Sequence, residues 1–107
     1  MLKSAPSRPA LAANEIESLI DCVSQLKGAR FLGSPVEVGS SNAARFLRHE
    51  LAAKGERVAS AEEFIRWCAT RSESSGRVYE VLLPGGVVQP AAELLSEALR
   101  QLRTKRP

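Results

Sequence analysis

The sequence has few of the residues that build catalytic and metal sites. Its 107 residues include one histidine, His49, and two cysteines, Cys22 and Cys68. No second cysteine or histidine stands at metal-ligand spacing, and no acid or thiol is placed to support His49 as a general base. Both cysteines lie among apolar residues at helical positions, where a thiol commonly behaves as a small buried hydrophobe. We therefore predict no enzyme activity, no metal and no cofactor.

Long apolar runs are also absent, because no stretch approaches the roughly 20 residues that a membrane-spanning helix needs. The first 13 residues contain Lys3 and Arg8, but Pro6 and Pro9 leave no continuous apolar segment, which does not fit a signal peptide. With so few cysteines, an extracellular disulfide framework is not expected. We expect a cytoplasmic protein that makes no membrane contact.

The composition is that of an ordinary globular domain. Hydrophobic residues make up 44% of the chain and charged residues 25%, which is typical of a domain with one core. We expect residues 1–13 to form a flexible arm, residues 14–103 a single domain and residues 104–107 a basic tail. The net charge of +3 permits contact with nucleic acid without requiring it. Basic residues gather in Arg45–Arg57 and in the last eight residues, which contain no acid.

Four segments have apolar residues at spacings of three and four, which predicts four amphipathic helices. The predicted helices span Asn14–Lys27, Ser41–Lys54, Ser60–Arg71 and Pro90–Arg103. Asn14 is expected to cap the first helix, and Gly55 to close the second with a positive φ. The third opens with the spacing of a capping box, in which the Ser60 hydroxyl accepts from the Glu63 N–H and the Glu63 carboxylate reaches back to the Ser60 N–H. Its buried face is expected to consist of Ala61, Phe64, Ile65 and Cys68.

Short strands are predicted between these helices. The alternation of Val36-Glu37-Val38 is typical of one strand, and Arg77–Leu83 is rich in β-forming residues. The Pro84-Gly85-Gly86 turn then allows Val87-Val88 to return antiparallel. The predicted fold class is α+β, rich in helix, with one short antiparallel hairpin.

The order helix, strand, helix, helix, strand, turn, strand and helix resembles the winged helix-turn-helix superfamily over roughly Asn14–Arg103. The resemblance is one of element order and turn placement. It implies that Ser60–Arg71 is a recognition helix that enters the major groove, and that Leu83–Val87 is the tip of a wing. On this interpretation the chain is a small transcriptional regulator that binds double-stranded DNA.

The resemblance also implies which residues contact the DNA. Side chains on the outer face of Ser60–Arg71 would reach base edges or phosphates, and the start of the second helix would present backbone N–H groups to a phosphate. The expected DNA-binding residues are Ser41, Asn42, Arg48, Arg57, Arg66, Thr70, Arg71 and Arg77. A homodimer would form through the apolar stripes of the first and last helices, with Leu95, Leu99 and Leu102 at its interface.

The acidic start of the third helix favours a second interpretation. Glu63 is accounted for by the capping box, but Glu62 would face the DNA backbone, which repels a carboxylate unless a cytosine amino group donates to it. The alternative is a protein-interaction module, such as an adaptor or an anti-activator, on the same scaffold. Its contact patch would contain Trp67, Phe64 and the acidic first turn, since interface hot spots favour tryptophan. The sequence leaves both interpretations open.

Overall fold

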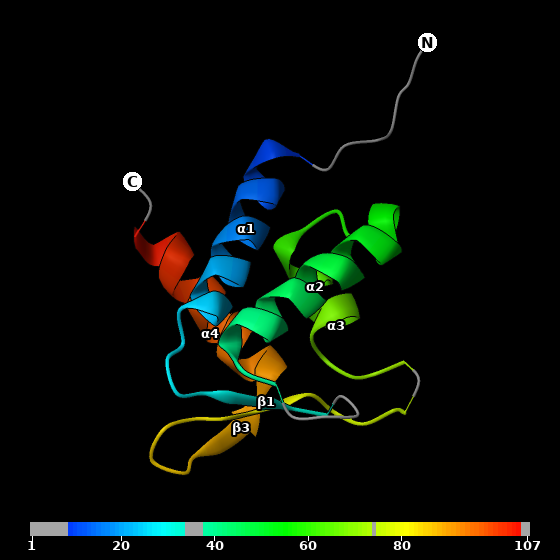
Figure 1. Cartoon of the computed structure of the whole chain (residues 1–107). Coiled ribbons are helices and arrows are strands. Elements are labelled where there is room, and N and C mark those ends of the chain that lie inside the picture. The colour runs from blue at the N-terminus through cyan, green and yellow to red at the C-terminus, as the bar shows by residue number, and fades with distance from the viewer. Residues whose placement is uncertain (1–8, 34–37, 74, 106–107) are drawn as a thin grey trace.

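The computed structural model describes residues 9–33, 38–73 and 75–105, and Figure 1 shows their arrangement. In chain order the elements are α1 (Ala10–Ser24), β1 (Arg30–Leu32), α2 (Ser40–Lys54), the 3-10 turn η1 (Gly55–Arg57), α3 (Ala61–Cys68), β2 (Glu80–Leu82), β3 (Val88–Pro90) and α4 (Ala91–Lys105). The predicted α+β class with a short antiparallel hairpin is confirmed. None of the described helices is long and apolar enough to cross a membrane.

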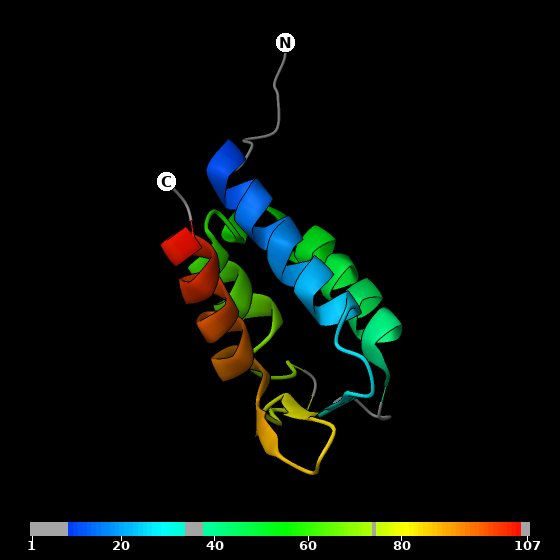
Figure 2. The ribbon, with the colours of Figure 1, turned by 90° about the vertical axis from the view of Figure 1, so that its left-hand side faces the viewer.

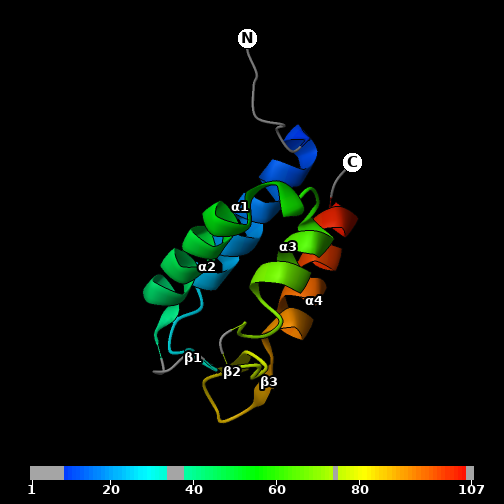
Figure 3. The same cartoon turned by 90° about the vertical axis from the view of Figure 1, so that its right-hand side faces the viewer.

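The helices form two layers above a small sheet. The pair α1 and α2 makes one layer and the pair α3 and α4 the other, as the two side views show (Figures 2 and 3). The sheet lies across the end of the helices at which α1 stops and α2 and α4 begin (Figure 1). Its strand order is β1-β2-β3, and both pairs are antiparallel, with Phe31 opposite Val81 and Val81 opposite Gln89.

The hydrophobic core lies between the two helix layers. The predicted apolar face of α3 is confirmed, because all four of its members are buried. The α1 stripe is buried over Ile16, Leu19, Ile20 and Val23, while Leu26 lies beyond the helix and is half-buried. Each helix thus buries one face against the opposite layer, which is the main stabilising contribution of such amphipathic helices.

The start of α1 differs from the prediction. The helix begins at Ala10, with Pro9 as its N-cap, and Asn14 is an exposed residue inside it. Proline is readily accommodated at a helix start because its ring presets a helical φ and it lacks an N–H that would need a partner. The predicted α2 closure is confirmed, since Gly55 caps that helix with a φ of 54°.

The third helix is shorter than predicted. It ends at Cys68, so Thr70 and Arg71 lie in the segment that follows. At its start the Ser60 hydroxyl accepts from the Glu63 N–H at 3.1 Å, as the capping box requires. The Glu63 carboxylate, however, accepts from the Ala59 N–H at 2.8 Å and not from that of Ser60. Both predicted side chains therefore take part in the cap, but the backbone N–H that donates to the Glu63 carboxylate is one residue earlier than predicted.

The first strand is also displaced. It is formed by Arg30–Leu32, and Val38 pairs back onto Phe31 as an isolated bridge, while Val36 and Glu37 lie outside the described residues. Arg30–Leu32 forms the strand because each of its residues pairs with a residue of β2. Pro90, predicted to open the last helix, is the final residue of β3, and α4 starts directly after it.

We expect Phe64→Ala to lower the free energy of unfolding by about 3–5 kcal/mol, because truncating a buried aromatic ring removes its contacts and leaves a cavity. Phe64 is 0% exposed at the centre of the core. Urea unfolding followed by circular dichroism measures the change. Val87→Ala, at an exposed site in the hairpin turn, should stay within about 0.5 kcal/mol of the parent protein. Equal losses for the two variants would contradict this account of the core.

Candidate interaction site between α3 and α4

An open groove of about 610 Å³ separates α3 from α4. Its floor is apolar, since Ile65 and Leu99 are both buried residues of the core. Its rims are polar and rich in arginine. The rim residues are Glu62, Arg66, Thr70, Ser96, Arg100, Arg103 and Thr104. We refer to this feature as the α3–α4 groove.

One end of the groove is closed by a salt-bridge cluster centred on Arg103. The Arg103 Nε lies 2.9 Å from Glu15 Oε2, and its Nη1 lies 2.6 Å from Glu62 Oε2. The Glu15 side chain is only 4% exposed, whereas Glu62 is at the surface. Because Arg103 belongs to α4, Glu15 to α1 and Glu62 to α3, a single guanidinium joins three helices. Glu62, unexplained in the sequence, thereby has an ionic partner within the molecule.

This pairing also sets the protonation behaviour of Glu62. Its hydrogen bonds with the Arg103 guanidinium hold the pKa of the Glu62 carboxyl below its ordinary value of 4.5. The same two carboxylates raise the pKa of Arg103. Both groups therefore stay charged at neutral pH, and the Glu62 carboxylate has a cationic partner at this point of the rim.

Beside the groove, Trp67 is in contact with two arginines. The guanidinium carbon of Arg66 lies 5.4 Å from the centroid of the Trp67 ring and that of Arg57 lies 5.5 Å away. These are cation–π distances. Trp67 remains 37% exposed. Among the described carboxylates, none forms an ion pair with Arg57 or Arg66, so this cluster presents positive charge and an aromatic surface to solvent.

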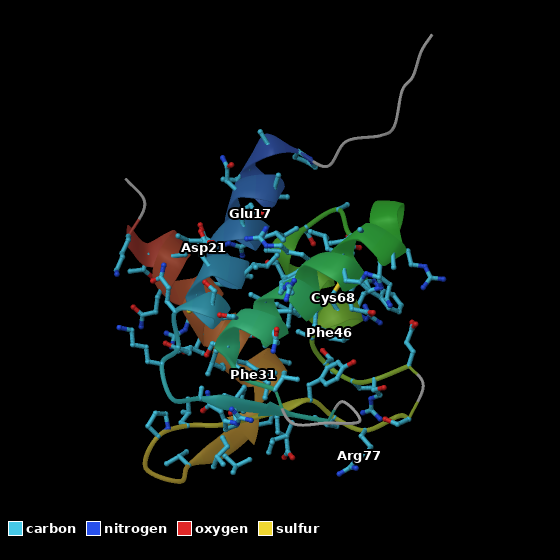
Figure 4. The ribbon with its side chains drawn as sticks, viewed as in Figure 1. Glu17, Asp21, Phe31, Phe46, Cys68 and Arg77 are labelled. Atoms are coloured by element: carbon cyan, nitrogen blue, oxygen red, sulfur yellow. The ribbon has the colours of Figure 1, made fainter. Side chains whose placement is uncertain are left out.

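The predicted DNA-binding residues do not gather on one surface. Arg48 lies against α1, where it is 2.8 Å from Glu17 and 3.7 Å from Asp21. Figure 4 places Glu17 and Asp21 near the upper part of the helices and Arg77 at the opposite end, beside the sheet. Arg48, which pairs with Glu17 and Asp21, therefore lies away from Arg77.

The remaining predicted contacts are equally dispersed. Ser41 and Asn42 are exposed in the first turn of α2, and Arg57 follows its last turn, about 22 Å away for a helix of 15 residues. In the segment after α3, the Thr70 hydroxyl donates to the Ile65 carbonyl and Arg71 donates to the Gly76 carbonyl. Of the eight predicted residues, the groove brings together only Arg66 and Thr70, with Arg57 adjacent through Trp67.

The predicted protein-contact residues divide in the same way. Trp67 is accessible, but Phe64, which was grouped with it, is fully buried. Leu95 and Leu99 are buried in the core and Leu102 is half-buried against it, because the apolar stripe of α4 packs on the other helices of the same chain. Leu95 and Leu99 are therefore packed within the monomer, and the homodimer through the first and last helices stays a prediction.

Sequence reasoning missed the groove-forming role of α4. In the sequence, Arg100 and Arg103 stand out only as members of the basic last eight residues, and neither spacing nor composition links Glu15 to them. Glu15 is separated from Arg103 by 88 positions in the sequence, and Glu62 is separated from Arg103 by 41. Periodicity within one helix carries no signal for such distances. Within the described residues, no group of three or more histidine, cysteine, aspartate or glutamate side chains could hold a metal ion.

Comparison with known proteins gives one match. A family model described as "Family of unknown function (DUF5329)" matches residues 10–103, which covers the whole of the fold from the first turn of α1 to the last turns of α4. No curated protein and no solved structure matches the chain.

The Arg103 cluster predicts a specific acid sensitivity. The folded-state pKa of Glu62 is depressed, so its stabilising contribution is fully present above its ordinary value of 4.5 and is lost as the pH falls through the folded pKa. Glu62→Gln should therefore reduce the loss of unfolding free energy on acidification below pH 4.5. Urea unfolding at several pH values measures this. An acid profile for Glu62→Gln that is the same as that of the parent would contradict the assignment.

Two neighbouring arginines of α4 provide a matched test of the cluster. Arg103→Gln takes this guanidinium away from the buried Glu15 carboxylate, and removing one partner of a buried ion pair is strongly destabilising. Arg100→Gln removes only the exposed pair with Glu97, which is worth little. We expect the first variant to show a clearly lower Tm and the second a Tm near that of the parent in differential scanning calorimetry. A similar Tm for both would show that Arg103 does not tie the helices together.

Proposed function

We propose that this chain, which belongs to the DUF5329 family of unknown function, is a protein-interaction module that binds an acidic segment of a partner in the α3–α4 groove. The observation that carries the proposal is the Arg57–Trp67–Arg66 cluster, which lies beside that groove and reaches its rim through Arg66. Tryptophan and arginine are the residues most enriched in interface hot spots. Here they lie together, accessible and next to a concave surface with an apolar floor.

The chemistry of the groove favours a carboxylate-bearing partner. Arginine binds carboxylates through two parallel hydrogen bonds, and its planar group stacks on aromatic rings while doing so. Arg66 on one rim already lies over Trp67, which restricts its conformations before binding. Arg100 stands on the opposite rim. An extended or helical segment with acidic and apolar residues would pair with these arginines and cover Ile65 and Leu99 between them.

Duplex DNA is less well supported as the partner. High affinity for DNA depends on several phosphate contacts made at once. The eight residues predicted for that role lie on different faces, and Arg48 is already paired with two carboxylates of α1. Transcriptional regulation through the winged helix-turn-helix resemblance therefore stays a prediction, and it becomes one outcome of the binding test below.

We place this interaction in the cytoplasm. The support is the state of the two cysteines, which are not joined to each other, Cys22 being half-buried on α1 and Cys68 buried on α3. A small domain in an oxidising compartment commonly depends on disulfides, whereas this one has a hydrophobic core built from apolar side chains of its helices and sheet.

The single tryptophan of the chain provides the assay, because Trp67 lies at the proposed site. We expect a short peptide rich in glutamate and leucine to change Trp67 fluorescence saturably, and its glutamine-substituted counterpart to bind much more weakly. Arg66→Ala should weaken binding by about tenfold, as hot-spot truncations commonly do. Arg45→Ala, at an exposed site on α2, is the matched control and should bind like the parent.

The same titration separates the two candidate functions. Binding of duplex DNA that is tighter than binding of the peptide and falls steeply with salt would favour the transcriptional regulator and overturn the proposal. Failure of the acidic peptide to bind, or equal affinity of Arg66→Ala and the parent, would also overturn it.

A further inference from the structure

A second concave site lies on the other side of the core, between the helices and the sheet. It is a cavity of about 130 Å³, and its lining combines residues of α1, α2, α4, β1 and β2. The floor is made of buried residues such as Val23, Leu47 and Val81. The mouth is formed by half-buried side chains, among them Phe31, Phe46 and Tyr79.

At three places in the chain, an alanine lines the cavity where a larger apolar side chain would fill it. Ala43 of α2, Ala69 after α3 and Ala91 of α4 are all buried and all line it. Protein interiors are packed about as densely as organic crystals, with few voids larger than a water molecule. A space of this size, bounded by three short side chains from separate parts of the chain, is therefore a distinct feature of this core.

The lining excludes charged and strongly polar occupants. Among the described residues that line the cavity, only Tyr79 has a polar side-chain atom, and its phenol is hydrogen-bonded with Ser72. A buried water needs two to four polar partners, which this lining does not supply. By contrast, a dry apolar cavity of about 150 Å³ in another protein binds benzene. The chemistry of the site thus matches an uncharged apolar molecule of similar size.

The rings at the mouth favour an aromatic occupant. Phe46 and Tyr79 already pack edge to face, with centroids 5.6 Å apart and an interplanar angle of 72°. A third ring inside the cavity would add contacts of the same kind, in which the edge of one ring meets the face of another. Phe31 of β1 supplies a further aromatic side chain at the opening.

We propose that the cavity between the helices and the sheet binds a small uncharged molecule with a single aromatic ring. The site shares none of its lining residues with the α3–α4 groove. The proposal is therefore independent of the protein-interaction function, and either can fail without the other.

Toluene is a suitable probe, with methyl NMR of the folded chain as the readout. Ring currents of a bound aromatic should shift the methyl signals of Val23, Val81 and Leu95 saturably. Saturating toluene should also raise Tm, because a ligand that binds only the folded state stabilises it. Benzoate, of the same shape but charged, should produce neither effect, and cyclohexane should bind more weakly than toluene.

A matched pair of variants on α2 tests the location. Ala43→Leu places a larger side chain in the cavity and should weaken toluene binding at least tenfold, whereas Ala53→Leu makes the same change at an exposed site and should have no effect. If Ala43→Leu does not fold, Ala69→Val fills the cavity from another element. Absence of saturable shifts, binding that survives filling of the cavity, or equal binding of benzoate would overturn the proposal, and cyclohexane binding as tightly as toluene would overturn its aromatic specificity.

Discussion

The guanidinium of Arg103 is the point at which three helices are held in register. Through Glu15 it fixes α4 against α1, and through Glu62 it fixes α4 against α3. The distance between the two rims of the α3–α4 groove depends on that second contact, since it bridges the groove at one end. The same contact gives the exposed Glu62 carboxylate a partner beside the surface that Arg66 and Trp67 present. One ionic cluster thus links the packing of three helices to the shape of the proposed binding site.

The α3–α4 groove and the cavity differ in how completely side chains fill the core beside them. Beneath the α3–α4 groove the core is filled by side chains. Ile65 and Leu99 form the apolar floor of the groove, and polar residues form its rims. In the cavity the core is incomplete, because alanines stand where larger residues would fill it. An unfilled cavity of 130 Å³ costs about 3 kcal/mol at the cost per unit volume measured for engineered cavities. An occupant that relieves this cost would stabilise the whole fold.

Local features of this fold could be read from the sequence, and contacts between distant segments could not. The apolar face of α3, the Ser60 cap and the Gly55 helix end depend on residues within one or two turns of each other, and each is present. The position of β1 depended on pairing with β2 some 50 residues away, and the role of Glu62 on Arg103 in another helix. The groove and the cavity are products of such contacts, so neither had a signature in spacing or composition.

The ends of the sheet carry a further consequence. Along its outer strand, β3, Pro90 has no N–H to donate, and the chain turns directly into α4. On the other side, Phe31 of β1 exchanges backbone hydrogen bonds with Val38, which occupies part of that edge. Unprotected edges invite strand addition between molecules, the first step toward fibrillar aggregation. Each border of this sheet therefore offers fewer free backbone groups to a second molecule, which disfavours strand addition between copies.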